Sequence, residues 1–494
     1  MAVAFIMAWQ AETVEQRGTG AEGAEGADAA GLLAGFRREL HACLTARADA
    51  LFELADAVLC VDGPVRTLVE LALAPEHRRG HGALYDGFNG GRVEVARLRR
   101  AVAGLPVPRG RDGRITLAVD VSPWLRPEAA GSPDRLFCHV HGRGKGQAQM
   151  IPGWPYSFVA ALEPGRTSWT AVLDAVRLGP GDDETAVTAG QIREVVERLA
   201  EAGHWRDGEA DILIVLDAGY DVTRLAFLLA DLPVELLARM RSDRVLHFPA
   251  PPRQACAVGR PVRHGAAFAF AGPAWPRPRA ATTTETPRYG TACAQAWDRP
   301  HPRLARRGAW EDHDGDLPIL EGTVIRLEVD HLPGDRAPKP LWLWWSRAGA
   351  TPADVDRLWQ AFLRRFDIEH TFRLFKQTLG WTAPKTRDPA AADRWTWLII
   401  ACHTQLRLAR DLTADLRRPW ERPAPPGRLT PARVRRGFRR LRPTTALPAS
   451  APKPTRPGPG RPPGSKNTRQ APRHPVGKHP KPDTAKPGQN KQAG

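Results

Sequence analysis

Cysteine is scarce in this sequence of 494 residues, and no long apolar segment is present. The six cysteines are scattered without a CxxC pair, so neither a disulfide framework nor a thiolate zinc site is indicated. No segment approaches the roughly 20 consecutive apolar residues of a membrane helix. The apolar run at residues 1–9 has no basic flank, unlike a signal peptide. We therefore expect a cytoplasmic protein without membrane contact.

Acidic residues are nearly absent from the C-terminal segment. From Glu421 to Gly494 there are 18 Lys and Arg but only two acidic residues. Of the totals of 71 basic and 54 acidic residues, the rest of the chain therefore holds 53 and 52 and is almost neutral. A localised cationic segment favours a polyanionic partner, most often nucleic acid. A solubilising tail or a coding bias towards arginine would give the same composition.

The pattern of residues changes several times along the chain, which predicts distinct segments. Apolar residues first recur at helical spacing, then strand-like and helical runs alternate, and the final part is basic and rich in proline. The expected segments are 1–30, disordered; 31–110, an N-terminal helical domain; 111–244, the first part of an α/β core; 245–335, a β-rich insertion; 336–415, the second part of the core; and 416–494, a basic, disordered, proline-rich tail.

Within these segments, runs of apolar residues predict individual elements. Strands are expected at Arg114–Val121, Arg135–His141, Tyr156–Leu162, Asp211–Asp217, Val234–Met240, Thr323–Val329 and Leu341–Ser346. Helices are expected at Gln191–Ala202, Thr223–Ala230, Pro352–Leu379, Ala391–Leu412 and, within the tail, Pro431–Leu441. The fold class is therefore α/β, with a sheet flanked by helices.

Three carboxylates stand out because of the segments that carry them. Asp120 lies within an apolar strand, Asp217 closes another, and Glu369 lies in the long late helix. A carboxylate in an apolar strand is costly unless it is paired or binds a metal ion, and Mg²⁺ prefers such oxygen ligands. Taken singly, a strand that ends in Asp is common in α/β proteins. Together, the three acids are candidates for two-metal phosphoryl transfer.

The helix around Glu369 adds cations on the same face. Arg365, Glu369, Arg373 and Lys376 follow one another at intervals of four, four and three residues, which is one stripe of a helix. Such a stripe suits a site that binds metal ions and also contacts phosphates. A surface helix with ordinary ion pairs along it would show the same pattern.

The spacing Phe362-x2-Arg365-x3-Glu369-x6-Lys376 resembles the Tyr-Arg-Glu-Lys signature of bacterial insertion-sequence DDE transposases. Phe362 departs from it, because the signature has Tyr there. The segment Asp217-Ala218-Gly219-Tyr220 is similar to the family's second-aspartate segment and Asp120 to its first aspartate, and the β-rich insertion falls between the second Asp and the Glu as in such enzymes.

The resemblance implies an RNase H-like core that cuts and joins double-stranded DNA. It implies that Asp120, Asp217 and Glu369 are catalytic and hold Mg²⁺ or Mn²⁺, and that Arg365 and Lys376 contact DNA phosphates. The partners would be the element's terminal inverted repeats and target DNA, bound by a homo-oligomer. Two alternatives stay open: a catalytically inactive transposase-like DNA-binding protein, and a metal-dependent nuclease without strand transfer.

Other parts of the chain are further candidates for DNA contact. Arg461, in the sequence Gly460-Arg461-Pro462, resembles the core of an AT-hook, which lies in the minor groove. Arg373 is a candidate on the Glu369 helix, and the tail helix would add phosphate contacts. We expect the N-terminal helices to recognise the element's ends. Trp124, near the first aspartate, is either a core residue or a stacking platform for a displaced base.

Overall fold

The computed structural model describes residues 21–140, 149–165, 167–253, 259–331, 338–425, 427–453, 464 and 470–477. Its central feature is a ten-stranded mixed sheet, in the order β11-β12-β13-β14-β8-β7-β3-β5-β4, with β6 also paired to β5. The strands of this sheet are β3 (Thr116–Leu125), β4 (Leu136–Val140), β5 (Gln149–Leu162), β6 (Thr170–Arg177), β7 (Ile212–Leu216), β8 (Val234–Met240), β11 (Ala280–Thr286), β12 (Gly290–Asp298), β13 (Thr323–Val329) and β14 (Leu341–Trp345).

The middle of the sheet is parallel and its flanks are antiparallel. Strand β7 pairs in parallel with β3 on one side and with β8 on the other, whereas β5 runs antiparallel to β3. All five residues of β7 are buried, as expected for a central strand that is covered on both faces. The predicted α/β class is confirmed, and the sheet with its flanking helices is an RNase H-like fold.

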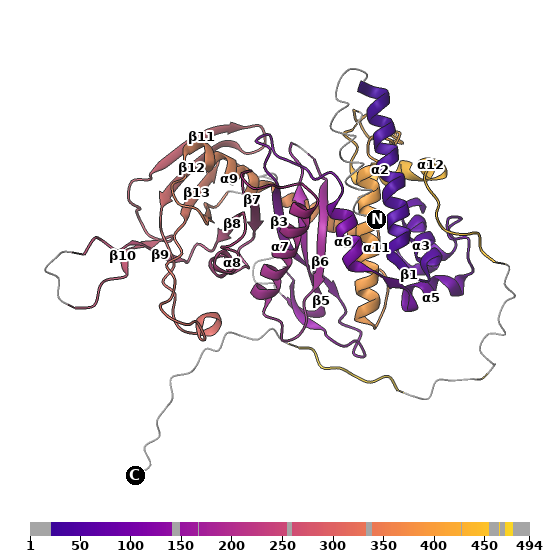
Figure 1. Cartoon of the computed structure of the whole chain (residues 1–494), viewed down its shortest axis with the longest axis horizontal. Coiled ribbons are helices and arrows are strands. Elements are labelled where there is room, and N and C mark those ends of the chain that lie inside the picture. Colours follow the sequence, from indigo (N-terminus) through magenta and orange to yellow (C-terminus); the bar gives the residue numbers. More distant parts are fainter. Residues whose placement is uncertain are drawn as a thin grey trace, which may run out of the picture.

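Helices cover the sheet and form a cluster beside it (Figure 1). The helices are α2 (Ala21–Cys43), α3 (Ala48–Cys60), α4 (Leu68–Ala72), α5 (His81–Gly90), α6 (Val95–Ala103), α7 (Glu184–Glu201), α8 (Val222–Leu228), α9 (Pro352–Arg364), α10 (Phe366–Gln377), α11 (Pro389–Leu408) and α12 (Pro431–Leu441), with 3₁₀ turns at Gly308–Trp310 and Arg442–Thr444. Helix α11 contacts α2 and α3 on one side and β6 on the other. A single buried cluster therefore extends from Leu33 in α2 through Val119 in β3 to Phe438 in α12.

The predicted β-rich insertion is built onto the main sheet. Strands β11, β12 and β13 form an antiparallel meander that continues through β14 to β8 (Figure 1). Strands β9 (Val245–Pro249) and β10 (His264–Ala269) form a separate antiparallel pair, and His247 of β9 also bridges to His301. A further short pair, β1 (Leu44–Ala46) with β2 (Arg92–Val93), lies among the N-terminal helices.

Two expectations about helices are wrong. The predicted continuous helix Pro352–Leu379 is two helices, because Arg365 both ends α9 and precedes α10. Residues 21–30, expected to be disordered, form the first turns of α2. The rest of the predicted disordered N-terminus, residues 1–20, lies outside the described residues.

Helix α12, whose bounds agree with those of the helix predicted within the tail, is part of the folded body. Val434 and Phe438 are fully buried, and α12 packs against α3 and α11. Its buried Arg435 donates hydrogen bonds to the carbonyl oxygens of Val58, Val61 and Gly63, which satisfies the C-terminal end of α3. This arginine is therefore not available to DNA phosphates, and the predicted phosphate contacts of the tail helix stay a prediction for its exposed residues Arg439 and Arg440.

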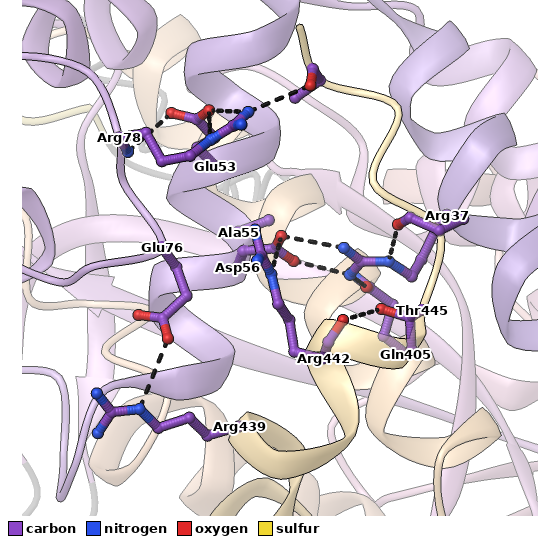
Figure 2. Close-up of polar contacts among 12 residues, drawn as sticks. Arg37, Glu53, Ala55, Asp56, Glu76, Arg78, Gln405, Arg439, Arg442 and Thr445 are labelled. Atoms are coloured by element: carbon purple, nitrogen blue, oxygen red, sulfur yellow. Dashed lines mark hydrogen bonds and ion pairs between the residues drawn. The ribbon is translucent and has the colours of Figure 1, made fainter. Parts of the chain in front are cut away.

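A buried polar cluster fastens the segment after α12 to the helices (Figure 2). Asp56 of α3 accepts hydrogen bonds from both Arg37 of α2 and Arg442. Arg37 also donates to the side chain of Gln405 in α11, at 2.6 Å. The cluster therefore joins chain segments from both ends of the described sequence.

Trp124 is a core residue, which decides between the two interpretations of this side chain. It is fully buried and makes edge contacts with Trp154 and Trp381, at ring-centroid distances of 6.1 and 6.2 Å. Within the described part of the chain, no helix combines the length and the apolar character that crossing a membrane requires.

Candidate active site

Asp120 lies on β3, which borders the central strand β7. Its neighbour Val119 is fully buried, and its own side chain is 20% exposed. One carboxylate oxygen accepts a hydrogen bond from the backbone N–H of Val121, at 2.9 Å. Burial raises the pKa of Asp120 to about 6, although the charge of Arg365 opposes this rise.

Asp217 is brought beside Asp120 by the parallel pairing of β3 and β7. The register places Val119 opposite Leu216, so the next residue on each chain is an aspartate. One oxygen of Asp217, Oδ1, is buried without a hydrogen-bond donor, and Nη1 of Arg239 lies 4.0 Å from it. The two predicted aspartates are therefore adjacent, and one of them has an unused acceptor.

Glu369 reaches the same place from the first turn of α10. The break between α9 and α10 lets the second helix begin at Phe366, and Arg365 and Glu369 lie one turn apart. The backbone N–H of Arg365 still bonds to the carbonyl of Phe362, so the chain turns without losing its local hydrogen bonds. The Glu369 side chain is about half exposed, at 49%.

The guanidinium of Arg365 contacts all three acids. Its Nη1 lies 2.8 Å from Asp120, and its Nη2 lies 3.4 Å from Asp217 and 3.5 Å from Glu369. The Arg365 side chain is only 4% exposed, and its Nε is buried without an acceptor. One positive charge thus faces three carboxylates, which leaves an excess of negative charge when all three are ionised.

Among the described residues, Arg373 and Lys376 form no ion pair with the three acids, although the charge of Asp120 acts on Lys376. The ammonium of Lys376 lies 5.6 Å from the centre of the Trp381 ring, and burial lowers its pKa to about 8. Arg373 is exposed to solvent on α10. Arg461, in the predicted AT-hook, lies outside the described residues.

Phe362, at the position where the signature has Tyr, is only 3% exposed. It is part of an apolar cluster formed by α9 and the β11–β14 part of the sheet. The side chain serves as a packing residue of α9, and the Arg365 guanidinium lies 5.9 Å from its ring centre.

Two residues of the site were missed in the sequence. Arg239 lies beside Asp217 because the parallel register of β7 and β8 places Leu216 opposite Ala238. The strand order would have indicated this contact, but the sequence does not contain it. Tyr220 has a buried hydroxyl without a hydrogen-bond partner, and burial next to the charge of Asp120 keeps its pKa well above the usual value. Its position in the Asp217–Tyr220 segment was the available signal.

The donor chemistry of the cluster fits a divalent cation. Carboxylate oxygens are the ligands that Mg²⁺ and Mn²⁺ prefer, and Oδ1 of Asp217 is a buried oxygen without a hydrogen-bond donor. Among the described residues, no group of three His, Cys, Asp or Glu side chains is spaced for metal binding as it stands. In the cluster around Asp120, the Arg365 guanidinium is in contact with all three carboxylates instead.

The RNase H-like sheet and the acids beside its parallel centre define a protein of the nuclease and transposase class. Residues 39–303 match the family model of the DDE superfamily endonucleases. This match covers more than half of the chain, and the chain belongs to that family. The matched region includes Asp120 and Asp217 but ends before Glu369, so the interpretation of the glutamate depends on the spacing of its neighbours and on the geometry. No match was found among curated proteins.

Proposed function

We propose that the protein is the transposase of an insertion sequence and that it cleaves the element's ends and joins them to target DNA. Family membership supports a DNA substrate and a nucleic-acid-cleaving activity. The observation that carries the proposal is the meeting of Asp120, Asp217 and Glu369 around one guanidinium, from three distant parts of the chain. A purely structural ion pair would need only one of these acids.

In this proposal the three carboxylates hold two Mg²⁺ or Mn²⁺ ions. The chemistry that such ions supply when bound is activation of the attacking oxygen and neutralisation of charge at the phosphorus. The protein's own residues position the DNA: Arg365, Arg373 and Lys376 bind phosphates beside the scissile bond, and the sheet fixes the two aspartates side by side. No side chain has to act as a nucleophile, because water and then a 3′-hydroxyl attack phosphorus.

The remaining assignments concern DNA outside the reaction centre. The helical segment 31–110 recognises the terminal inverted repeats, and Arg461 with the basic tail adds contacts that depend little on sequence. Two ends must be cut and joined together, which calls for a homo-oligomer on DNA. Such a protein would be associated with the nucleoid in the cytoplasm.

The test is a cleavage and joining assay with a duplex that carries both ends of the element, Mg²⁺ and a supercoiled target plasmid. The wild-type protein is expected to release 3′-hydroxyl ends and to join them to the plasmid. Asp217→Asn should abolish both products while leaving DNA binding in place. Asp231→Asn is the matched control, because Asp231 is exposed and pairs only with Arg193 among the described residues.

Each alternative predicts a different result in the same assay. Binding without cleavage by the wild-type protein would identify an inactive DNA-binding protein. Nicks or breaks without joined products would identify a metal-dependent nuclease. Equal activity of Asp217→Asn and the wild type would exclude the proposed site.

A further inference from the structure

Arg365 and Asp217 each keep one buried polar atom unsatisfied although they lie in the same ion cluster. The Nε of Arg365 has no acceptor, and Oδ1 of Asp217 has no donor. Both groups are nevertheless in contact, through Nη2 and Oδ2, at 3.4 Å. The DNA-free cluster thus holds one unused donor and one unused acceptor within a single ion pair.

The two unused atoms need different partners. A carboxylate oxygen can be satisfied by a hard cation, whereas a guanidinium N–H can be satisfied by an anionic oxygen such as that of a phosphate. In the DNA-free cluster the two atoms do not pair with each other, because the guanidinium faces Asp120, Asp217 and Glu369 through Nη1 and Nη2. The unused acceptor is therefore open to a cation and the unused donor to an anion.

The Arg365 guanidinium also lies where a cation bound by the three acids would lie. It contacts Asp120, Asp217 and Glu369 at once, so a cation that binds these carboxylates has to compete with its positive charge. A divalent cation that binds these acids neutralises them and removes the reason for the guanidinium to stay among them. The freed guanidinium, held at the junction of α9 and α10, can then turn to a phosphate.

We propose that Arg365 is an internal counter-ion that couples the binding of a divalent cation to the binding of DNA. In the DNA-free protein Arg365 competes with the cation for the three acids. A DNA phosphate draws Arg365 away and so tightens cation binding, and the cation tightens DNA binding by the same factor, because coupling between two ligands is reciprocal. This inference rests on the proposed function, since it takes the three acids as the cation site.

The test measures Mn²⁺ binding by electron paramagnetic resonance of the free ion, with and without a 40-base-pair duplex, and needs no catalysis. Without DNA, Arg365→Gln should bind Mn²⁺ about tenfold more tightly than the wild type, because the competing charge is gone. Adding the duplex should tighten Mn²⁺ binding to the wild type about tenfold and to Arg365→Gln by less than about twofold. Arg365→Lys keeps the positive charge but lacks the planar guanidinium, so its Mn²⁺ affinity should lie between those of the wild type and Arg365→Gln. It replaces Arg365→Gln in the test if that variant does not fold.

The matched control is Arg198→Gln. Arg198 also bridges two acids, the buried Asp174 and the exposed Glu194, but on α7. The Arg198→Gln variant should bind Mn²⁺ as tightly as the wild type, both with and without DNA. An equal gain of Mn²⁺ affinity in Arg198→Gln would mean that any unpaired carboxylates bind the ion, which overturns the proposal.

The outcomes separate the two proposals. If the wild type and Arg365→Gln bind Mn²⁺ equally and DNA changes neither, Arg365 is not a coupling residue, although the metal site stands. Two other results would show that the three acids are not a metal site, so that the proposed function itself fails. One is that Asp217→Asn binds Mn²⁺ as tightly as the wild type. The other is that neither the wild type nor Arg365→Gln binds Mn²⁺, even with DNA.

Discussion

The guanidinium of Arg442 lies 3.2 Å from the carboxylate of Asp56, although 386 residues separate them in the sequence. Asp56 is buried in the middle of α3 and also pairs with the buried Arg37, at 2.7 Å (Figure 2). The segment after α12 therefore closes a network inside the N-terminal helices. Helix α2 and the segment around Arg442 are therefore joined by charge as well as by apolar packing.

Asp56→Asn is expected to lower the free energy of unfolding by about 3–5 kcal/mol, because it leaves the buried Arg37 without its anionic partner. Urea unfolding followed by circular dichroism measures the change. Asp62→Asn is the control, because Asp62 is 94% exposed and pairs only with Arg439 among the described residues. The control should change stability by less than about 0.5 kcal/mol, and similar losses in both variants would contradict the role of the buried network.

Gly437 lets α12 approach the turn after α11. A Cβ at this position would lie 2.2 Å from Cγ2 of Thr413 and 2.9 Å from the carbonyl oxygen of Ala414. Gly437→Ala is therefore expected to cost about 1–3 kcal/mol, despite the better helix propensity of Ala. Gly190→Ala in α7, where a Cβ meets nothing within 4 Å, should instead stabilise by up to about 1 kcal/mol. Thermal unfolding of the two variants should shift in opposite directions, and a stabilised Gly437→Ala would refute the close approach.

Lys376 should make DNA binding depend on pH above neutrality. Burial lowers its pKa to about 8, so the ammonium loses its proton and its attraction for phosphate as the pH rises through that value. The affinity for a DNA duplex, measured by fluorescence anisotropy at constant ionic strength, should fall between pH 7.5 and 9, by at most about tenfold per pH unit. In Lys376→Arg the side chain stays charged, so this fall should disappear. An identical pH profile in the two proteins would exclude Lys376 from DNA contact.

The basic tail, residues 454–494, should contribute a salt-dependent part of DNA binding. Residues 454–494 contain nine Lys and Arg and one acidic residue, Asp483. A chain of full length in which Gln replaces these nine residues should show a shallower slope of log affinity against log salt, by about 0.9 for each phosphate contact that is lost. An unchanged slope would favour the solubilising role that the composition also allows.

Continuous apolar strands were predictable from the sequence. The bounds of β8 and β13 were predicted to the residue, because apolar and β-branched residues predominate in each. Strand β6 was missed because Asp174 interrupts it; that carboxylate is buried only because Arg99 and Arg198 pair with it from other elements. Helix α7 begins seven residues before the predicted start, since Asp183 caps it ahead of the amphipathic stretch.

For the site, the sequence identified side chains but not their contacts. Asp120 and Asp217 stood out as acids in apolar strands, and Glu369 through the spacing of its neighbours. No proline or glycine in the sequence marks the break at Arg365. This break directs the guanidinium toward Asp120, Asp217 and Glu369. Contacts between residues 245 positions apart, such as that of Arg365 with Asp120, depend on the strand order, which local patterns do not contain.

The central claim is that Asp120, Asp217 and Glu369 bind cations at one place, and cleavage of the protein by bound Fe²⁺ tests it directly. Fe²⁺ that replaces Mg²⁺ generates hydroxyl radicals with ascorbate and peroxide, and these cut the polypeptide next to the ion. We predict three cuts, close to residues 120, 217 and 369, all suppressed by excess Mg²⁺ and absent in Asp217→Asn. Cuts near only one or two of these residues, or cuts that Asp217→Asn leaves in place, would contradict a common metal site.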